Sequence, residues 1–273
     1  GDTTGFDYAG GFPLPVGITN ADGTSGSAVY DFMGRLQSTQ DENGKITTYH
    51  WDDAGRLIKV TDPTGGFTAF AYDGNKLTSA TDSLGRTTSY EYDTSDRLTK
   101  KTNADGSTTD YEYNGNGDLI RMTDGRGHDT FYSYRPDRKL LTVTDPMGGV
   151  TTYDYDAAGN TTSITDANGH VTSFGYDAAN RMTSRTADGG ITRYIHDAVG
   201  NVLSVSDPLL HTTLYAFDAY NRVIQMTDAA NGVTSSSYDE SGNIVSTTDP
   251  NGHTTSYTYD DRGNQTSMTD AFL

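Results

Sequence analysis

A unit of about 21 residues recurs along the whole sequence, and it constrains the fold more than any other feature. The stretch YDAAGNTTSITDANGHVTSFG, residues 155–175, shows its skeleton: aromatic-Asp-x-x-Gly, a run rich in Thr, Thr-Asp-x-x-Gly, then Thr-x-aromatic. Such spacing predicts a tandem repeat rather than an ordinary globular domain. The residue that opens each repeat, called here the opening aromatic position, is Tyr30, Trp51, Tyr72, Tyr92, Tyr113, Tyr134, Tyr155, Tyr176, His196, Phe217, Tyr238 and Tyr259.

Each repeat carries two turn signals. One is Asp-x-x-Gly after Thr, as in Asp62-Pro63-Thr64-Gly65, which predicts a type I turn followed by a left-handed residue that closes a hairpin. The other follows the opening aromatic, where Gly lies four residues on; Asn or Asp, which also tolerate the left-handed region, replace it in some repeats. The predicted left-handed residues of the second turn are Gly34, Gly55, Gly117, Gly159, Gly200, Gly242 and Gly263, with Asp96, Asn180 and Asn221 as substitutes, and Asn231 is a substitute in the first.

Two short strands per repeat follow from these turns, of the kind Arg56–Thr61 and Val150–Tyr155. The second strand alternates, so that Thr151, Tyr153 and Tyr155 share one face and the other face is mostly polar. In the first strand we expect apolar residues on both faces, as in Leu119, Ile120 and Met122, or Val223, Ile224 and Met226.

The fold class is therefore all-β, built from tandem antiparallel β-hairpin repeats of about 21 residues. About two dozen strands at ~4.8 Å spacing would make a flat sheet more than ~110 Å wide. Open twisted sheets rarely exceed ~10 strands without curling. The sequence therefore predicts a curled, spiralling sheet that forms the wall of a shell.

The two ends of the sequence fit the repeat less well. We interpret residues 1–29 as a degenerate repeat, with Phe6-Asp7 in place of the opening aromatic-Asp pair, and residues 30–273 as an array of about twelve repeats, the last incomplete. The Pro-broken segment 11–17 predicts a bulge or a sheet edge. Neither end resembles the polar cap of a terminal repeat, so we expect a section of a longer array or covered ends.

Composition excludes several functional classes. The net charge of −18 argues against nucleic-acid binding and against contact with anionic lipid, because both need a basic face. No apolar run approaches the ~18 residues of a membrane span, and the first residues lack the features of a signal peptide. With no Cys, disulfides and thiol catalysis are excluded, which fits an exported bacterial protein, secreted or at the cell surface.

Residues with ligand chemistry recur at repeat positions. His128, His170, His211 and His253 are equivalent, but equivalent positions two repeats apart lie ~19 Å from each other along the sheet, so we interpret them as exposed turn residues rather than a metal site. The repeated Asp residues suggest either calcium ligands or side chains that cap their own turns. The second interpretation is favoured because adjacent members of a row are ~9.6 Å apart, too far to bind one ion together.

We find no nucleophile with a base, no carboxylate pair, no HExxH and no phosphate loop that stands out from a sequence rich in Gly, Ser and Asp, and therefore predict no enzymatic activity and no cofactor. Solvent-facing Tyr rows would suit sugar stacking, but a half-buried aromatic ladder more often serves the core. The residues that we predict to define the repeat structurally are Tyr30, Trp51, Tyr72, Tyr92, Tyr113, Tyr134, Tyr155, Tyr176, Phe217, Tyr238 and Tyr259, with Gly55, Gly117, Gly159 and Gly242.

The motif aromatic-Asp-x-x-Gly-Arg-Leu, as at residues 51–57, followed by Thr-Asp-x-x-Gly-x-x-Thr-x-Tyr, resembles the YD-repeat (Rhs-repeat) family over nearly the whole chain. That resemblance implies a β-hairpin strip wound into a hollow shell, as in bacterial polymorphic toxins, insecticidal toxin complexes and teneurins. In the toxins the shell encloses a C-terminal toxin domain, often released by aspartyl self-cleavage at an end segment. No such segment is found here, so neither cleavage nor toxin activity is carried over.

Two functional hypotheses follow. The first is a non-enzymatic shell segment that encloses a toxin or other cargo polypeptide. The alternative is an extracellular or cell-surface element for adhesion or carbohydrate binding, whose copies associate through edge strands, possible partners being further repeats of the same chain or a glycan.

Overall fold

In the computed structural model, residues 3–8, 14–20 and 22–270 are described. Within them the regular elements are 26 β-strands and no helix, so the all-β prediction and its two strands per repeat are confirmed. Strand length is five to seven residues. The strands are β1 Thr3–Tyr8, β2 Pro15–Thr19, β3 Ser25–Tyr30, β4 Leu36–Gln40, β5 Ile46–Trp51, β6 Leu57–Thr61, β7 Phe67–Asp73, β8 Lys76–Asp82, β9 Thr87–Tyr92, β10 Leu98–Thr102, β11 Thr108–Tyr113, β12 Leu119–Thr123, β13 Asp129–Tyr134, β14 Leu140–Thr144, β15 Val150–Tyr155, β16 Thr161–Thr165, β17 Val171–Tyr176, β18 Met182–Ala187, β19 Gly190–His196, β20 Val202–Ser206, β21 Thr212–Phe217, β22 Val223–Thr227, β23 Val233–Tyr238, β24 Ile244–Thr248, β25 Thr254–Tyr259 and β26 Gln265–Thr269.

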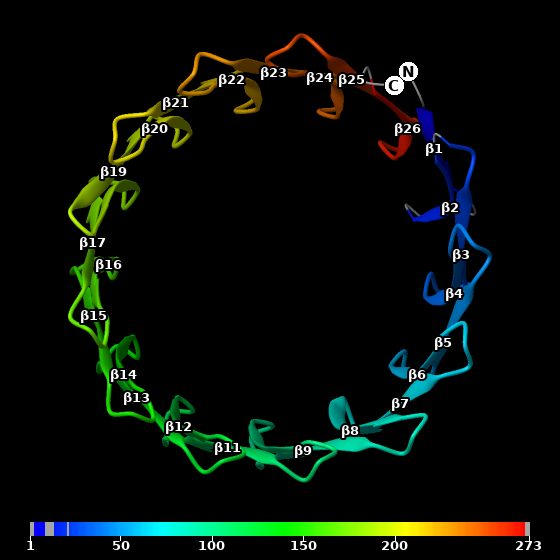
Figure 1. Ribbon diagram of the computed structural model, residues 1–273, viewed down its shortest axis with the longest axis vertical. Coiled ribbons are helices and arrows are strands. Elements are labelled where there is room, and N and C mark those ends of the chain that lie inside the picture. Colours follow the sequence, from blue (N-terminus) through cyan, green and yellow to red (C-terminus); the bar gives the residue numbers. More distant parts are fainter. Residues whose placement is uncertain (1–2, 9–13, 21, 271–273) are drawn as a thin grey trace. The chain divides into compact units, whose positions relative to one another are not determined.

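The chain divides into two compact units. Compact unit 1 comprises residues 1–71, 81–84 and 215–273, and compact unit 2 comprises residues 72–80 and 85–214. In compact unit 2 consecutive strands from β9 to β21 pair antiparallel in chain order. In compact unit 1 antiparallel pairing runs from β22 to β26, continues from β26 to β1, and then follows β1 to β7. Within each unit the strands follow a curved path (Figure 1).

The turns adopt the predicted geometry. After β6, the N–H of Gly65 donates to the carbonyl of Asp62 (3.1 Å), and the N–H of Asp62 donates to the carbonyl of Gly66 (2.8 Å). Gly65 has φ +89, in the left-handed region that favours glycine. The predicted substitutes also occupy that region, with φ between 60 and 67 for Asp96, Asn180, Asn221 and Asn231.

Leu210 adopts the left-handed region with φ 67, which the sequence did not predict. The residue is 72% exposed. A left-handed L-residue costs about 1–2 kcal/mol, and this exposed side chain gains little packing in return. We expect Leu210→Gly to raise the free energy of unfolding by about 1 kcal/mol, measured by thermal unfolding. Leu209→Gly is the control, because Leu209 is similarly exposed (76%) and we expect its replacement to destabilise. A Leu210→Gly variant no more stable than the parent would contradict this.

A β-bulge recurs in hairpins that carry an opening aromatic residue. Between β15 and β16, Asp154 pairs with Ser163 but Tyr155 pairs with Thr161, so that Thr162 is an extra residue. The alternate hairpins, such as β14–β15, keep a continuous register. A bulge bends its strand and increases the local twist, so one bulge per repeat curls the sheet in a regular way. The same register shift occurs in β3–β4, β5–β6, β9–β10, β11–β12, β13–β14, β17–β18, β19–β20, β23–β24 and β25–β26.

The bulge corrects the expected distribution of apolar residues in the first strand of a repeat. Leu119 pairs with Tyr113, and Met122 pairs with Tyr111, while Ile120 is the extra residue. Cross-strand partners project to the same side of a sheet, so Leu119 and Met122 lie on one face with the two tyrosines. Simple alternation would place Leu119 and Met122 on opposite faces, and the inserted residue instead brings both to the face with the tyrosines.

The N-terminal repeat also differs from expectation. Tyr8, not Phe6, takes the opening aromatic position, because Tyr8 pairs with Pro15 across a register shift in the way Tyr30 pairs with Leu36. Of the Pro-broken segment, residues 11–13 lie outside the described residues. Pro15 begins β2, which lies between β1 and β3, so the bulge is confirmed and the sheet-edge prediction was wrong. The predicted incomplete end, residues 271–273, also lies outside the described residues.

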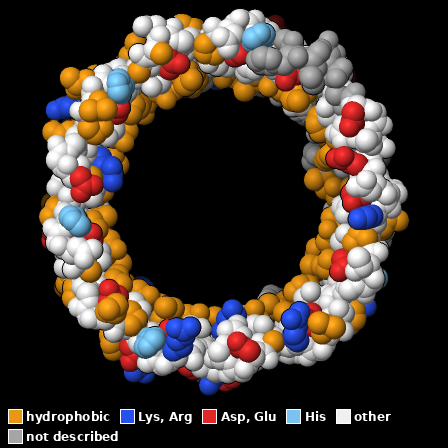
Figure 2. Space-filling view, in the orientation of Figure 1, with side chains coloured by type: hydrophobic (Ala, Val, Ile, Leu, Met, Phe, Trp, Pro, Cys, Tyr) orange, Lys and Arg blue, Asp and Glu red, His pale blue; other side chains and the backbone are white. Residues whose placement is uncertain are grey.

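Neither face of the sheet is covered by a second layer of the described residues. Among them no hydrophobic residue is fully buried, and the aromatic residues are mostly half-buried. Exposed apolar residues on the face opposite the tyrosines include Val150 and Val171, 41% and 49% exposed. In each compact unit, hydrophobic side chains (a class that includes Tyr) line the concave side, and charged side chains are scattered along the strand ends (Figure 2).

No helix in the described part of the chain has the length and apolar character to cross a membrane.

Candidate functional surface

The most regular surface is the face that carries the tyrosines, called here the tyrosine face and exemplified by Thr151, Tyr153 and Tyr155. The Tyr155 hydroxyl donates a hydrogen bond of 2.8 Å to the carbonyl of Leu140, which begins β14. Each such bond ties a repeat to the one before it. Equivalent bonds run from Tyr92 to Leu77, Tyr113 to Leu98, Tyr134 to Leu119, Tyr176 to Thr161, Tyr238 to Val223 and Tyr259 to Ile244, and Trp51 donates its Nε1–H to Leu36.

Partial burial of the opening tyrosines changes the pKa of their hydroxyl groups. Desolvation raises the pKa of Tyr113, Tyr134 and Tyr155 above the usual value, since the phenolate is disfavoured there. The opening position is less well satisfied elsewhere: Tyr30 reaches the Pro15 carbonyl at 3.4 Å, and Phe217 has no hydroxyl to donate.

An arginine joins successive repeats at the turn that follows the opening aromatic. Arg97 Nε donates to Asp93 Oδ2 at 2.7 Å in its own turn, and Nη1 donates to the Asn114 carbonyl of the next turn at 3.4 Å. Its Cζ also lies 4.8 Å from the ring centroid of Tyr113. These contacts combine an ion pair, a backbone bond and a cation–π interaction. Arg35 and Arg222 make the same three contacts.

One repeat uses a different charge arrangement. Asn114 replaces the turn Asp, and Asp118 replaces the Arg that follows the turn. The missing cation comes from Arg138 of the next repeat, whose Nη2 and Nε donate to Asp118 Oδ1 at 2.7 and 2.9 Å. Asp118 is 9% exposed, and Arg138 is itself left-handed with φ 65. The ion pair explains why an arginine stays in that unfavourable backbone region.

This arrangement gives a prediction that a double-mutant cycle can test. Arg138→Gly leaves the Asp118 carboxylate without its ion pair, so we expect the unfolding temperature to fall by several degrees although backbone strain is relieved. In an Asn114→Asp, Asp118→Arg background, which restores the common Asp–Arg turn, we expect Arg138→Gly to raise the unfolding temperature. An equal effect of Arg138→Gly in both backgrounds would contradict the pairing.

The aspartate rows cap their turns, as the favoured interpretation predicted. Asp31 Oδ1 accepts hydrogen bonds from the N–H of Met33 and of Arg35, both at 2.9 Å. Hydrogen bonds and an adjacent guanidinium stabilise the ionised form: Arg181 lowers the pKa of Asp177 to about 2. Among the described residues no three His, Asp or Glu side chains lie close enough to share a metal ion.

The histidines continue this capping pattern. His170 Nδ1 lies 3.0 Å from Asp166 Oδ2 within its own turn, and that carboxylate raises the pKa of His170. His128, His211 and His253 make the equivalent contact with Asp124, Asp207 and Asp249, at 3.2, 2.9 and 3.1 Å. The side chains of these histidines are 40–68% exposed. They are exposed turn residues with a local partner, as the sequence predicted.

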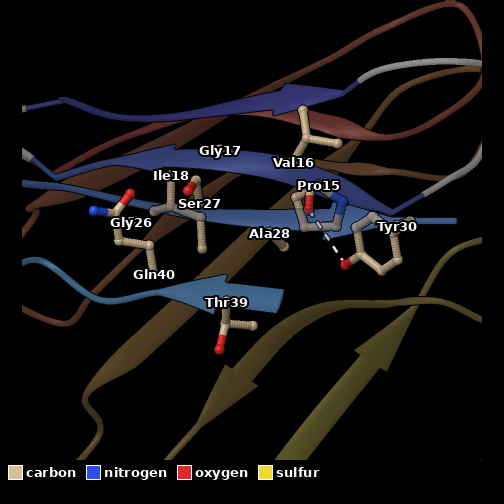
Figure 3. Close-up of a pocket in the computed structure, with 10 residues that line it drawn as sticks. All are labelled: Pro15, Val16, Gly17, Ile18, Gly26, Ser27, Ala28, Tyr30, Thr39 and Gln40. Atoms are coloured by element: carbon tan, nitrogen blue, oxygen red, sulfur yellow. Dashed lines mark hydrogen bonds between the residues drawn. The ribbon is translucent and has the colours of Figure 1, made fainter. Parts of the chain in front are cut away.

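A pocket of about 280 Å³ opens on compact unit 1 between β2, β3 and β4 (Figure 3). It exists because Ala28 takes the place that Tyr49 has in the next repeat, and Gly26 takes the place of Thr47. Tyr30, at one end, bonds the Pro15 carbonyl. Tyr30 is the only titratable residue in the lining, and the pocket marks a gap in the tyrosine rows.

Comparison with models of known protein families shows the family of the chain. The model of the RHS Repeat family matches residues 34–68, 51–75, 72–108, 92–129, 137–170, 155–192, 196–234 and 238–272. The chain belongs to the RHS repeat family. The matched segments cover most of the array between residues 34 and 272, and consecutive matches overlap or follow closely, as tandem copies require. No curated protein sequence matches the chain.

Solved structures show the same RHS repeat fold. The crystal structure of TcdB2-TccC3-Cdc42 aligns with a TM-score of 0.57 and 16% identity over 93% of this chain. The crystal structure of TcdB2-TccC3 without the hypervariable C-terminal region aligns with a TM-score of 0.57 and 17% identity over 94% of this chain. The structure of the Photorhabdus luminescens Tc holotoxin pore with the mutation TccC3-D651A aligns with a TM-score of 0.51 and 15% identity over 95% of this chain. The RHS repeats here span only 16–19% of those chains.

The RHS repeat residues singled out from the sequence fall into two groups in the structure. The opening aromatics lie along the tyrosine face, and Gly55, Gly117, Gly159 and Gly242 have φ between 82 and 92. The arginine contacts and the bulge were not predicted. A signal for the arginines was available, since Arg or Lys recurs directly after the left-handed residue, but the carbonyl it reaches in the next turn cannot be seen in one repeat alone.

Proposed function

We propose that this chain is a non-enzymatic segment of an RHS repeat shell that encloses a toxin or other cargo polypeptide. The observation that carries the proposal is a single-layer sheet: the RHS repeats leave no described hydrophobic residue fully buried. A polypeptide enclosed by such a wall would meet its side chains directly. We propose residues 1–29 as a degenerate first repeat and 30–273 as the array, with the opening aromatics and turn glycines as the residues that define each repeat.

The accessible surface supports a wall-like role. The chain exposes 16494 Å² at 29.4 kDa. A compact monomer of this mass would expose about 11,500 Å². A single-layer sheet with two accessible faces would expose such an excess of surface. The acidic net charge of −18 would keep such a sheet from aggregating.

The similar structures support a cargo in general terms. They are complexes of TcdB2 with TccC3, one of them described without a hypervariable C-terminal region, and one is a Tc holotoxin pore. By analogy we propose an exported protein, secreted or at the cell surface, whose partner is an enclosed polypeptide. The carbohydrate-binding alternative gains no support, since the tyrosine hydroxyls of the ladder already donate to backbone carbonyls.

Protease protection of a guest tests this function. The probe is a reduced, carboxymethylated polypeptide that cannot refold, mixed with the chain and digested with trypsin. We expect the probe to be digested more slowly in the presence of the chain than in the presence of an equal mass of serum albumin. We expect the Ile164→Lys variant to lose this protection, because it places a charge beside Tyr153 on the tyrosine face. Val171→Lys on the opposite face is the matched control and should keep protection. Digestion at the rate of the free probe would overturn the proposal.

A further inference from the structure

Two positively charged residues interrupt the apolar pattern of the tyrosine face in compact unit 2. They lie at the residue of the first strand that pairs with the aromatic two residues before the opening aromatic, called here the partner position. Lys101 pairs there with Tyr90, and Arg185 pairs with Phe174. Each cation replaces an apolar side chain beside the aromatic rows and loses its hydrophobic contact. In four other repeats the partner position is apolar, namely Met122, Val143, Ile164 and Val205.

The same two repeats lack the aspartate that begins the turn two residues after the partner position. Lys101 is followed there by Asn103, and Arg185 is followed by Ala187. The repeats with an apolar partner position have an aspartate instead, namely Asp124, Asp145, Asp166 and Asp207. Each cation therefore occurs where the carboxylate that would be nearest to it along the chain is missing.

Neither Lys101 nor Arg185 makes an ion pair or a cation–π contact within the part of the chain that the structure describes. Asp105, further along the turn after Lys101, instead accepts hydrogen bonds from the N–H and the hydroxyl of Ser107, at 2.9 and 2.7 Å. By contrast Lys100, on the opposite face of the same strand, lies 3.6 Å from Asp110. Lys101 is half-buried and Arg185 is exposed, so both can meet a bound molecule.

The charge of the tyrosine face differs from that of the whole chain. In compact unit 2 its other strand positions hold Thr, aromatic, His or apolar residues, whereas exposed carboxylates such as Glu91, Glu112 and Asp154 lie on the opposite face. Equivalent turn positions of consecutive repeats are ~9.6 Å apart, and charges beyond ~8 Å are largely screened at physiological ionic strength. Lys101 and Arg185 therefore outweigh the net charge of −18 at their own positions. Lys or Arg side chains are visible on the concave side of compact unit 2 (Figure 2).

We propose that Lys101 and Arg185 bind carboxylate groups of the enclosed polypeptide, so that acidic segments of a guest are held at two places on the tyrosine face. Ammonium and guanidinium groups donate charge-assisted hydrogen bonds to carboxylates, and the neighbouring rings offer apolar contact to the rest of the segment. The inference rests on the proposed function, because it specifies the chemistry of the guest that the wall would contact.

Two unfolded peptides that differ only in having Glu or Gln at the same positions test this inference. Each carries a neutral dye and is titrated with the whole chain, and binding is measured by fluorescence anisotropy. We expect the Glu peptide to bind about threefold more tightly, although the net charge of the chain would repel it. The preference should shrink as salt is added. It should disappear or reverse in the double variant Lys101→Met, Arg185→Met.

The matched control is the double variant Lys100→Met, Arg193→Met, which removes the same charge from the opposite face. There Lys100 pairs with Glu91, and Arg193 pairs with Ser184. This control should keep the preference for the Glu peptide. Circular dichroism checks that each variant folds, and Lys101→Gln with Arg185→Gln replaces the methionine pair if that pair does not.

A third site can be built as a test of gain. We expect Ile164→Lys combined with Asp166→Asn to increase the preference for the Glu peptide, whereas Ile164→Lys alone should not, because Asp166 remains two residues on. Equal binding of the two peptides to the parent chain, or an equal loss of preference in the matched control, would overturn the inference and leave the proposed shell function standing. If neither peptide bound, the result would overturn the inference and contradict the proposed function as well.

Discussion

Tyr155→Ala is expected to lower the free energy of unfolding by about 3 kcal/mol, the largest loss from one substitution on the tyrosine face. The change removes a half-buried ring, the hydroxyl bond to Leu140, and cation–π contacts with Arg135 and Lys139 at 5.5 and 5.3 Å. Because repeats interact mainly with their neighbours, the loss should be concentrated nearby. Hydrogen exchange read by mass spectrometry should show faster exchange in β14–β16 than in β9–β11.

Tyr155→Phe is the matched control, since it deletes only the hydroxyl bond. We expect it to cost about 1 kcal/mol, with the ring and both cation–π contacts kept. If the alanine and phenylalanine variants were equally destabilised, the packing role of the ring would be wrong. If neither changed exchange in β14 and β16, the ladder would not join the repeats.

Acid is expected to destabilise the whole array, because the same cap recurs in nearly every turn. Hydrogen bonds to the carboxylate lower the pKa of Asp52, Asp93 and Asp177 relative to 3.8, in Asp177 to about 2. A lowered folded-state pKa adds stability that is present above the unfolded value and lost as pH falls through the folded one. The same direction holds for Asp22, Asp62, Asp105, Asp118, Asp124, Asp156, Asp166, Asp239 and Asp260.

We therefore expect an unfolding temperature that is nearly constant from pH 7 to 5 and falls by on the order of 10 °C or more between about pH 4 and 2. His170 has the opposite sign: its raised pKa contributes stability at acidic pH that is lost as pH rises past that pKa. Thermal unfolding by circular dichroism at constant ionic strength measures the profile. Asp177→Asn, which still accepts the turn N–H bonds as Asn114 does, should flatten it slightly. A constant or rising temperature below pH 4 would contradict the capping role.

The hairpins and their left-handed residues could be predicted because each depends on local chemistry. Gly148 and Asn231 sit in turns whose residue types require positive φ, and the tyrosine alternation on β15 follows from strand geometry. The bulge could not be predicted, because the sequence does not distinguish an Ile120 that has a cross-strand partner from an Ile120 that is inserted without one. It becomes visible only in the register against Tyr113.

Residues whose placement depends on partners in another repeat were also missed. Arg138 has no preference for the left-handed region, and only Asp118, in the preceding repeat, explains it. Tyr8 was overlooked because Ala9 follows it, where the repeat has Asp, so that Phe6-Asp7 looked like the better match. Pairing with Pro15 places Tyr8 correctly. In each case local sequence is ambiguous and cross-strand register is not.

Tyrosine nitration mapped by mass spectrometry tests most directly the claim that the opening tyrosines form the structural spine. Tyr220, in a turn, is 79% exposed and should be nitrated first. Tyr113, Tyr134 and Tyr155 are half-buried, donate their hydroxyls to the backbone, and have a raised pKa, so they should react only after denaturant is added. Nitration of these three in the native chain at the rate of Tyr220 would contradict the account.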